Sequence, residues 1–391
     1  MSLDPNRLNP IYAEMGVTIF EAMSLASKDF QAINLGQGFP DAPGPRPLLE
    51  AAARAVLDGP NQYPPSRGLP ALRQAVVRHY DRHQGVDLTE AGVLVTSGAT
   101  EAIAAAILAV VRPGDGVVVI EPAYDAYGPL VRRAGGVVQP VRLAPPDWRI
   151  TEAVLDAAVT PATRALILNN PHNPTGRVFD AGELAAVAAV CLRHDLIAIS
   201  DEVWEHVVFD GRGLHSLLAL PGMAERTIKV GSAGKMFGLT GWKVGFACGD
   251  PALIDVVARA HQFLTFTTPP NLQAAVAEGL DWPDDWFTGM RAELQRSRDR
   301  LASGLADAGF VATPSEGTYF LCIDLAASGL GLDDEAIAWT LVREHGVASI
   351  PVSVFQSGPT TGVLRLCFAK ADKVLDEAIE RLARARYALK V

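Results

Sequence analysis

Cysteine is scarce in this chain of 391 residues, and its four copies lie far apart. Cys191, Cys248, Cys322 and Cys367 each stand in an apolar segment, and no two of them form a CxxC pair. Metal sites and redox motifs built on closely spaced cysteines are therefore excluded, and no metal is expected. Buried, reduced thiols are favoured over disulfides. Reduced thiols are typical of cytoplasmic proteins, so the cytoplasm is the expected location.

Long apolar runs are also missing. The most hydrophobic stretch, residues 93–111, is interrupted by hydroxyl side chains, a glycine and Glu101, so it predicts a strand, a turn and an alanine-rich helix rather than a membrane span. Residues 1–9 have neither the basic start nor the apolar middle of a signal peptide. No membrane partner is expected.

Positive charge is in deficit, with a formal net charge of -10 at pH 7 and a pI near 5.3. This balance argues against a surface for nucleic acid or anionic lipid, although a local basic cluster can still bind phosphate. Apolar residues make up 49% of the chain, enough to fill large cores, and a divisor of about 150 residues per domain suggests two or three domains. The expected ligand is a small molecule.

Short apolar runs alternate with helical stretches through the first two thirds of the chain, which predicts a mostly parallel α/β sheet covered on both faces. The expected strands are residues 93–96, 117–121, 137–141, 165–169, 196–200, 227–231 and 244–248. In such sheets, ligands gather at the carboxyl ends of the strands. The residues that follow each run are therefore the candidates for a site.

The pattern changes after residue 282, where a turn leads into a long amphipathic helix expected over residues 284–308. We predict a large domain over residues 41–282, a smaller one over 283–391, and an N-terminal arm over 1–40 that joins the smaller domain. Helical spacing predicts further helices at 11–28, 48–57, 70–84, 333–345 and 371–388. Strands of the smaller domain are expected at 317–323, 347–351 and 363–368.

A lysine among regularly spaced glycines stands between the last two strands of the large sheet, in residues 230–246. Lys235 is therefore expected on a loop where backbone can approach a ligand. A lysine becomes a nucleophile only when it is neutral, and partial desolvation beside another cation such as Lys243 lowers its pKa enough for Schiff-base chemistry. A solvated loop lysine is the ordinary alternative.

Three other positions are candidate functional sites because they lie at the end of a strand or within one. The Thr-Ser-Gly-Ala-Thr run of residues 96–100 opens a helix, so its free amides predict a phosphate cradle, with an ordinary N-cap as the alternative. Asp201 closes a buried strand and needs a partner, unless it is an exposed or capping residue. Arg365 lies in an apolar strand, where it fits a ligand carboxylate or a neighbouring acid.

Other polar positions also have ordinary structural explanations when the residues are taken alone. Residues 36–41 fit a connecting turn, Tyr63 a surface side chain and Tyr124 a packed ring. Residues 169–176 are dense in turn formers and fit a structural turn.

Residues 232–237 (Ser-Ala-Gly-Lys-Met-Phe) and 240–245 (Thr-Gly-Trp-Lys-Val-Gly) closely resemble the cofactor-lysine motif of class I pyridoxal-phosphate aminotransferases. Residues 34–41 (Asn-Leu-Gly-Gln-Gly-Phe-Pro-Asp) resemble the segment that covers the substrate in the kynurenine, glutamine and methionine branch of that family. Residues 362–368 fit the pattern Gly-Xaa-Xaa-Arg-Xaa-Xaa-Phe of its substrate-carboxylate strand. The resemblance covers nearly the full chain, with the motifs in the same order.

This resemblance implies a fold type I architecture, with a large domain of helices around a mostly parallel seven-stranded sheet and a smaller α/β domain. It also implies a homodimer with shared active sites that binds pyridoxal 5'-phosphate and moves an amino group from an L-amino acid to a 2-oxo acid. In the family's mechanism, Lys235 holds the cofactor as a Schiff base and moves the proton of the substrate α-carbon.

The resemblance assigns cofactor contacts to several positions of this chain. The phosphate is expected against Gly98, Ala99, Thr100, Ser232 and Lys243, and against Tyr63 of the other subunit. The pyridine ring is expected against Tyr124, Asn173, Asp201 and Trp204, with Asp201 at the ring nitrogen. Relatives usually carry tyrosine where Trp204 stands, and an indole N–H can donate a hydrogen bond but can neither accept one nor ionise.

Substrate contacts are implied in the same way. The substrate carboxylate is expected against the Gly38 amide, Asn173 and Arg365, and the side chain near Phe266, which the partner subunit can contribute. No second arginine occurs in residues 264–270, so an acidic side chain is not expected. Apolar, aromatic and sulfur-containing amino acids, or glutamine, are the expected donors.

Two alternatives remain open. A carbon–sulfur β-lyase uses the same carbanion to expel a β-substituent from a cysteine conjugate. A regulator that only senses the cofactor is less favoured, because such proteins carry an added DNA-binding domain and no basic arm is seen here.

Overall fold

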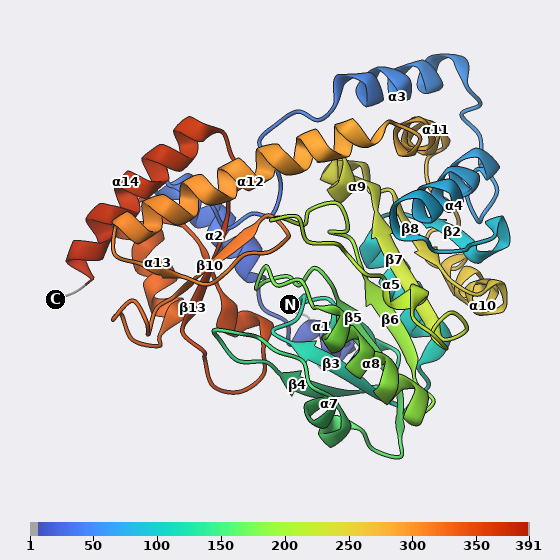
Figure 1. Ribbon diagram of the computed structural model, residues 1–391, viewed down its shortest axis with the longest axis horizontal. Coiled ribbons are helices and arrows are strands. Elements are labelled where there is room, and N and C mark those ends of the chain that lie inside the picture. Colours follow the sequence, from blue (N-terminus) through green and yellow to red (C-terminus); the bar gives the residue numbers. More distant parts are fainter. Residues whose placement is uncertain (1–6, 390–391) are drawn as a thin grey trace.

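A seven-stranded sheet forms the centre of the computed structural model, which describes residues 7–389 (Figure 1). Its spatial order is β2-β8-β7-β6-β5-β3-β4. The strands are β2 (Val93–Thr96), β3 (Gly116–Glu121), β4 (Val137–Arg142), β5 (Thr163–Asn169), β6 (Ile197–Asp201), β7 (Thr227–Ser232) and β8 (Gly245–Cys248). Each lies at one of the predicted apolar runs, so the predicted α/β sheet is confirmed.

The sheet is parallel except for β8, which runs antiparallel between β7 and β2. Parallel strands need long crossover connections, which contain α-helices here except between β6 and β7, where only a 3-10 turn at Leu217–Ala219 occurs. The helices of this part are α3 (Arg46–Asp58), α4 (Pro70–Gln84), α5 (Ala99–Val110), α6 (Tyr127–Arg133), α7 (Glu152–Ala158), α8 (Ala181–Arg193), α9 (Ala233–Met236), α10 (Pro251–His261) and α11 (Pro270–Leu280). Helix α5 packs on β6, β7 and β8, while α3 and α4 pack on α11.

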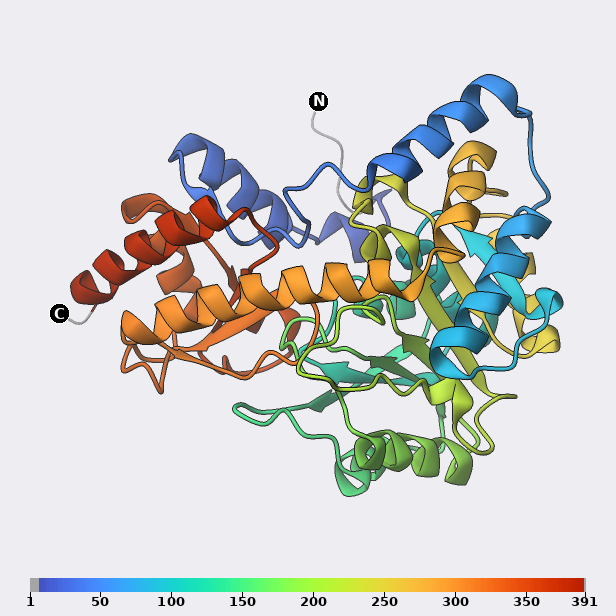
Figure 2. The same cartoon turned by 45° about the horizontal axis from the view of Figure 1, so that its top comes forward.

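A second, antiparallel sheet occupies the C-terminal part, in the order β12-β13-β10-β9. Its strands are β9 (Val311–Ala312), β10 (Phe320–Asp324), β12 (Ile350–Pro351) and β13 (Val363–Cys367). Its helices are α12 (Asp284–Asp307), α13 (Asp334–Glu344) and α14 (Asp372–Ala388). Helix α12 extends from the end of α11 across to α14, against which it packs (Figure 2).

The N-terminal segment lies against these C-terminal elements. Helix α2 (Ile19–Asp29) contacts α13 and β11 (Val347–Ala348), and β1 (Ile33–Asn34) pairs with β11 in parallel. The arm expected over residues 1–40 stays a prediction, and its residues 1–6 lie outside the described part of the chain. The domain boundaries after residues 40 and 282 stay a prediction.

Two predicted elements are each split in the structure. The helix expected over residues 11–28 is α1 (Pro10–Ala13) and α2, because the Thr18 hydroxyl accepts from the Glu21 amide and starts a new helix there. The strand expected over residues 347–351 is β11 and β12, which belong to different sheets and meet at the buried Ser349. Apolar spacing runs through both breaks, so it did not reveal them.

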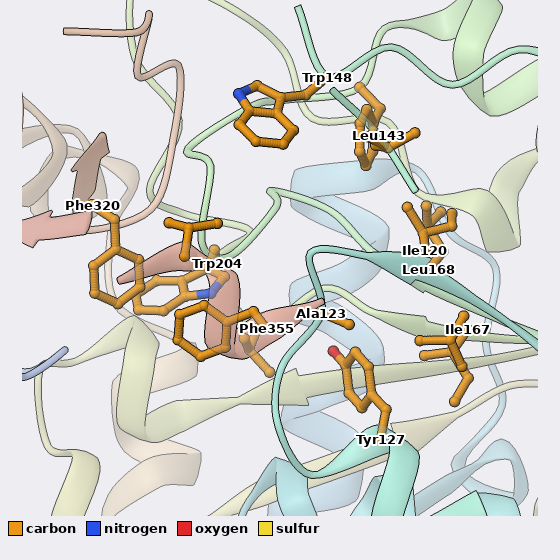
Figure 3. Close-up of a cluster of buried hydrophobic side chains, with 14 of the residues drawn as sticks. Ile120, Ala123, Tyr127, Leu143, Trp148, Ile167, Leu168, Trp204, Phe320 and Phe355 are labelled. Carbon is orange, nitrogen blue, oxygen red and sulfur yellow. The ribbon is translucent and has the colours of Figure 1, made fainter. Parts of the chain in front are cut away.

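A continuous apolar core joins the large sheet to the C-terminal sheet. In Figure 3, the rings of Trp204, Phe320 and Phe355 lie together, and Ala123 and Tyr127 lie between them and the sheet residues Ile120 and Ile167. The two sheets are therefore docked through packed side chains rather than joined by an open linker.

The four cysteines are buried and carry free thiols, as predicted. Within residues 7–389, no helix combines the length and apolar character needed to cross a membrane.

Strand β8 lies close to the start of α5, so a substitution of Gly245 tests how tightly the two pack. A Cβ at Gly245 would lie 2.6 Å from the Gly98 carbonyl carbon and 2.7 Å from the Ala99 nitrogen, which are backbone atoms that cannot rotate away. We expect Gly245→Ala to lower the free energy of unfolding by about 1–3 kcal/mol, measured by chemical denaturation. The control is Gly241→Ala, because no atom lies within 4 Å of its Cβ position and stability should be kept. Equal stability of the two variants would contradict the proposed contact.

Candidate active site

A cavity of about 320 Å³ opens at the carboxyl ends of the large sheet, between that sheet and the C-terminal part. Most of the predicted site residues line it: Gly38, Gly98, Ala99, Thr100, Tyr124, Asn173, Asp201, Trp204, Ser232, Lys235, Lys243 and Arg365. Side chains that were not predicted also line it, namely Phe20, Gln37, Ile103, Val203, Thr240 and Phe320.

Lys235 is partly buried, lines the cavity and lies in the short helix α9, not on the loop expected from the glycines. The Ser232 hydroxyl caps this helix by accepting from the Lys235 amide at 3.3 Å. The Lys235 Nζ donates to the Gly38 carbonyl at 3.2 Å and lies 4.6 Å from the centre of the Trp204 ring. The alternative of a solvated lysine is therefore wrong.

Burial lowers the pKa of Lys235 to about 8. The charges of Arg365 and Lys243 lower it further, and that of Asp201 opposes them. Lys243 thus acts as the predicted second cation, although Arg365 contributes more. An amine with this pKa is partly neutral near pH 7 and can act as a nucleophile.

Asp201 ends β6 in a fully buried position, so the alternatives of an exposed or capping residue are wrong. Burial raises its pKa to about 6, while a 2.5 Å hydrogen bond from the Tyr127 hydroxyl acts in the opposite direction. Tyr127 was not predicted. It follows Tyr124 by three residues, the two rings pack edge to face with centres 5.6 Å apart, and no sequence motif marks it.

The asparagine-rich turn after β5 connects this aspartate to Arg365. Asn169 Nδ2 donates to the Asp201 carbonyl at 2.9 Å, and Asn169 Oδ1 accepts from the Asn173 amide at 2.7 Å. Asn173 Oδ1 in turn accepts from Arg365 Nη1 at 2.8 Å. The turn therefore fixes the positions of three polar groups that face the cavity.

Arg365 is buried without a carboxylate partner in the part of the chain that the structure describes, so the salt-bridge alternative is wrong. Its second amino group donates to the Gly36 carbonyl at 2.9 Å, its Nε has no acceptor among the described residues, and its guanidinium lies 3.8 Å from the Phe320 ring centre. Burial lowers its pKa to about 10. An unpaired buried cation of this kind is a receptor for an anion.

The start of α5 lines the cavity, as a phosphate cradle there requires, but one of its amides differs from the expectation. Gly98 is the N-cap with a φ of 83°, but its amide donates to the Thr96 carbonyl at 2.8 Å and is not free. No side chain caps the helix, so the N-cap alternative for Ser97 or Thr100 is wrong. Because Gly98 lacks a side chain, the Lys243 side chain can lie beside it, 3.1 Å from its Cβ position.

Tyr63 and Phe266 lie outside the cavity lining. Their rings pack edge to face with centres 5.5 Å apart, and Tyr63 is 84% exposed. Neither side chain takes part in the site of its own chain.

A buried ion cluster, which sequence reasoning missed, lies behind the site. Lys229 of β7 donates to Glu202 at 2.5 Å and to Glu205 at 3.0 Å, and these acids hold its pKa high, at about 12, against the effect of burial. The cluster ties β7, which leads to Lys235, to the segment that carries Trp204. Lys229 is 27 and 24 residues from the two acids, so no local motif indicated the pairing.

The residues of the cavity fit pyridoxal 5'-phosphate. The lysine has a lowered pKa, a helix start and a second lysine suit the phosphate, and a buried carboxylate suits a pyridinium N–H. The orphaned Nε of Arg365 leaves a donor for the carboxylate of an amino acid.

A family model described as aminotransferase class I and II matches residues 31–382. The chain is 47% identical to the probable N-succinyldiaminopimelate aminotransferase of Mycobacterium tuberculosis, over 97% of each chain. It is 41% identical to the methionine aminotransferase of Escherichia coli, over 94% of this chain and 96% of the relative. The solved structure of an N-succinyldiaminopimelate aminotransferase from M. tuberculosis superposes with a TM-score of 0.92 at 46% identity, covering 98% of this chain and all of the other. The structure from E. coli reported to have a methionine aminotransferase function gives 0.93 at 40% identity, covering 96% and 99%.

We expect the same substitution at Lys235 and at Lys229 to have opposite effects on the stability of the cofactor-free protein. Below about pH 8, Lys235 is protonated in both folded and unfolded chains, so the folded state carries the cost of burying an ammonium. We expect Lys235→Met to raise the free energy of unfolding at pH 7 by up to roughly 3 kcal/mol, with the gain vanishing as pH rises toward 10.5.

Lys229→Met is the matched comparison, because it leaves two buried carboxylates without their cation. We expect a loss of about 3–5 kcal/mol at pH 7. Urea unfolding of both variants across pH 7–10.5 measures the two effects. Destabilisation by Lys235→Met at pH 7 would contradict the interpretation of its pKa.

Proposed function

We propose that the preferred amino donors of this protein are L-amino acids with uncharged side chains. The premise is that the chain belongs to the aminotransferase class I and II family and is a pyridoxal-phosphate-dependent aminotransferase. The acceptor is a 2-oxo acid. Apolar, aromatic and sulfur-containing side chains, and that of glutamine, are the favoured classes.

The observation that carries this proposal is the charge of the cavity lining. Its basic side chains are Lys235, Lys243 and Arg365. We assign the first two to the cofactor, so Arg365 is left for the α-carboxylate and no cation remains for an acidic side chain. The rest of the lining is rich in aromatic and aliphatic groups, including Phe20, which suits an apolar substrate.

The similarity to a methionine aminotransferase supports this choice. The greater identity to a probable N-succinyldiaminopimelate aminotransferase supports a second candidate, N-succinyldiaminopimelate. That molecule carries carboxylates besides the one beside the reacting amine, so it needs cations that this chain's own cavity lining does not supply.

Bound pyridoxal phosphate supplies an aldehyde that condenses with amines and a ring that takes up the electron pair of the α-carbon. Ala99, Thr100, Ser232 and Lys243 would hold its phosphate. Asp201, ionised and held by Tyr127, would face its ring nitrogen. Trp204 would lie beside the ring and donate its indole N–H.

Arg365 binds the α-carboxylate through its fork, and its bond to Asn173 sets the plane of that fork. Lys235 Nζ then moves the proton of the α-carbon, because its lowered pKa lets the amine act as base and, once protonated, as acid. Trp204, Tyr319 and Phe320 line the surroundings of these groups with aromatic surface, which excludes water from the reacting atoms.

We further propose that the protein acts as a homodimer in which Tyr63 reaches the cofactor phosphate of the partner subunit. The exposure of Tyr63, and its packing against Phe266 away from its own cavity, support this assignment. The free thiols support the proposed cytoplasmic location.

A panel of amino donors tests the substrate proposal. With one 2-oxo acid as acceptor, kcat/KM for methionine, phenylalanine and glutamine should exceed that for aspartate by at least about tenfold, because the aspartate side chain finds no cation. Lys235→Ala should be inactive with every donor. Aspartate as the best donor would contradict the proposal, and N-succinyldiaminopimelate as the best would favour the second candidate.

The β-lyase alternative has its own readout in the same assay. Release of pyruvate and ammonia from a cysteine conjugate without a 2-oxo acid, at a rate above transamination, would favour it.

Hybrid dimers test the role of Tyr63. One chain carries Lys235→Ala and the other Tyr63→Ala, so a shared site would combine the intact lysine of one chain with the intact tyrosine of the other. We expect the hybrid to have about half the activity of the wild-type dimer, well above either parent. If Tyr63 serves its own chain, activity stays at the level expected from the Tyr63→Ala chain alone.

A further inference from the structure

Three histidines come together outside the cavity lining. His79 and His83 lie one turn apart on α4, and His206 follows the end of β6. Each offers a ring nitrogen, and these atoms lie within 4.8 Å of one another. Cysteine spacing predicts no metal in this chain, but it says nothing of histidines that meet only in the folded state.

Hydrogen bonds indicate which ring nitrogens of the three histidines carry protons. His79 Nδ1 lies 3.2 Å from the Leu280 carbonyl, which can only accept, so Nδ1 carries the proton and Nε2 a lone pair. His206 Nε2 lies 2.8 Å from that lone pair and donates to it. The guanidinium Nε of Arg82 donates to His83 Nε2 at 3.1 Å, so this nitrogen also carries a lone pair.

We propose that His79, His83 and His206 bind a divalent transition-metal ion, with Zn²⁺ as the ion tested. Imidazole nitrogens suit zinc, copper and nickel rather than magnesium or calcium. Two histidines at i and i+4 on one helix face are a common ligand pair. The carbonyl on the second nitrogen of His79 orients that ring as metal-binding histidines are oriented.

The geometry needs only small side-chain rotations. Zn–N bonds are about 2.0–2.1 Å, so ligand nitrogens around one ion lie about 3.3 Å apart. The nitrogens of His79 and His206 are closer than this, and those of the whole group span up to 4.8 Å. The Asp284 carboxylate, 3.7 Å from His83 Nε2, lies near enough to turn in as a fourth ligand.

The charge state of the rings also suits a metal. Burial lowers the pKa of His79 to about 3 and that of His206 well below its ordinary value. Both imidazoles are therefore neutral at pH 7, and an ion that binds His206 Nε2 needs the proton on that nitrogen to move to Nδ1 of the same ring.

Arg82 opposes the ion, because its guanidinium lies against His83 and its charge is repulsive. Arg291 adds a weaker repulsion at His206. Arg82 also donates to the carbonyls of Leu280 and Trp282, at 3.1 and 3.0 Å, and its side chain is 36% exposed. It can keep those two bonds and release His83, so it is a competitor of the metal rather than a barrier.

A bound ion would join α4, the segment after β6 and the start of α12. His206 lies two residues after Trp204, so the ion would fix the far end of that segment without touching the cofactor. Its effect would be on stability, and the absorption band of the bound cofactor should not change.

The experiment uses the holoenzyme purified without a histidine tag and treated with a chelator. Equilibrium dialysis against Zn²⁺ with metal analysis should give one bound ion per chain and a higher melting temperature, and Co²⁺ should give a visible d–d spectrum. His79→Gln and His83→Gln should each weaken binding by at least about tenfold. His83 is only half-buried, so its variant tests the site even if His79→Gln does not fold.

Two further variants sharpen the test. His215→Gln removes an exposed histidine from elsewhere in the chain and should bind as the wild type does. Arg82→Met removes the competing cation and should bind severalfold more tightly, an effect that a loss of folding would not produce.

The proposal is overturned if the wild type holds no stoichiometric Zn²⁺ in dialysis. It is also overturned if His83→Gln binds as tightly as the wild type, because the ion then lies at the cofactor or on the surface. In either case the three rings form only a hydrogen-bonded stack against Phe287.

Discussion

Desolvation of a single amine is the constraint on which the site depends. In water a lysine keeps its proton, and only the walls of the cavity bring the pKa of Lys235 down to about 8. Those walls come from Gly38 in the N-terminal arm, Trp204 after β6, and Tyr319 ahead of β10. The amine is therefore reactive only when the two sheets are docked, and α9 alone would leave it charged.

Lys229, Lys235 and Arg365 differ in how their charges are balanced. Lys229 is satisfied within the chain by Glu202 and Glu205, and it contributes to holding the scaffold. Lys235 and Arg365 have no carboxylate within salt-bridge distance in the described chain, and both face the cavity. A protein accepts the cost of unpaired buried cations where a ligand completes the pairing, so the electrostatics of the site only become balanced with the cofactor and substrate in place.

The sequence was most informative where local pattern decides structure. Each strand of the large sheet is a short apolar run bounded by turn formers, and all were predicted. The breaks at Thr18 and Ser349 were not, because one depends on a cap and the other on which sheet each half joins. Most of the cavity residues were predicted through motif resemblance. Tyr127 and Tyr319 were not, because they bond to residues 74 and 84 positions away, which no local pattern records. The roles of Tyr63 and Phe266 stay predictions, since they concern a second subunit.

The reversed strand β8 determines the geometry of the lysine segment. Because β8 pairs antiparallel with β7, Ser232 and Gly245 are direct neighbours, and residues 233–244 form a loop that this pair closes at the carboxyl end of β7. A parallel strand in place of β8 would have put Lys243 at the other end of the strands, away from Lys235. Since the pair fixes both ends of the loop, a single inserted residue would shift Lys235 relative to Lys243.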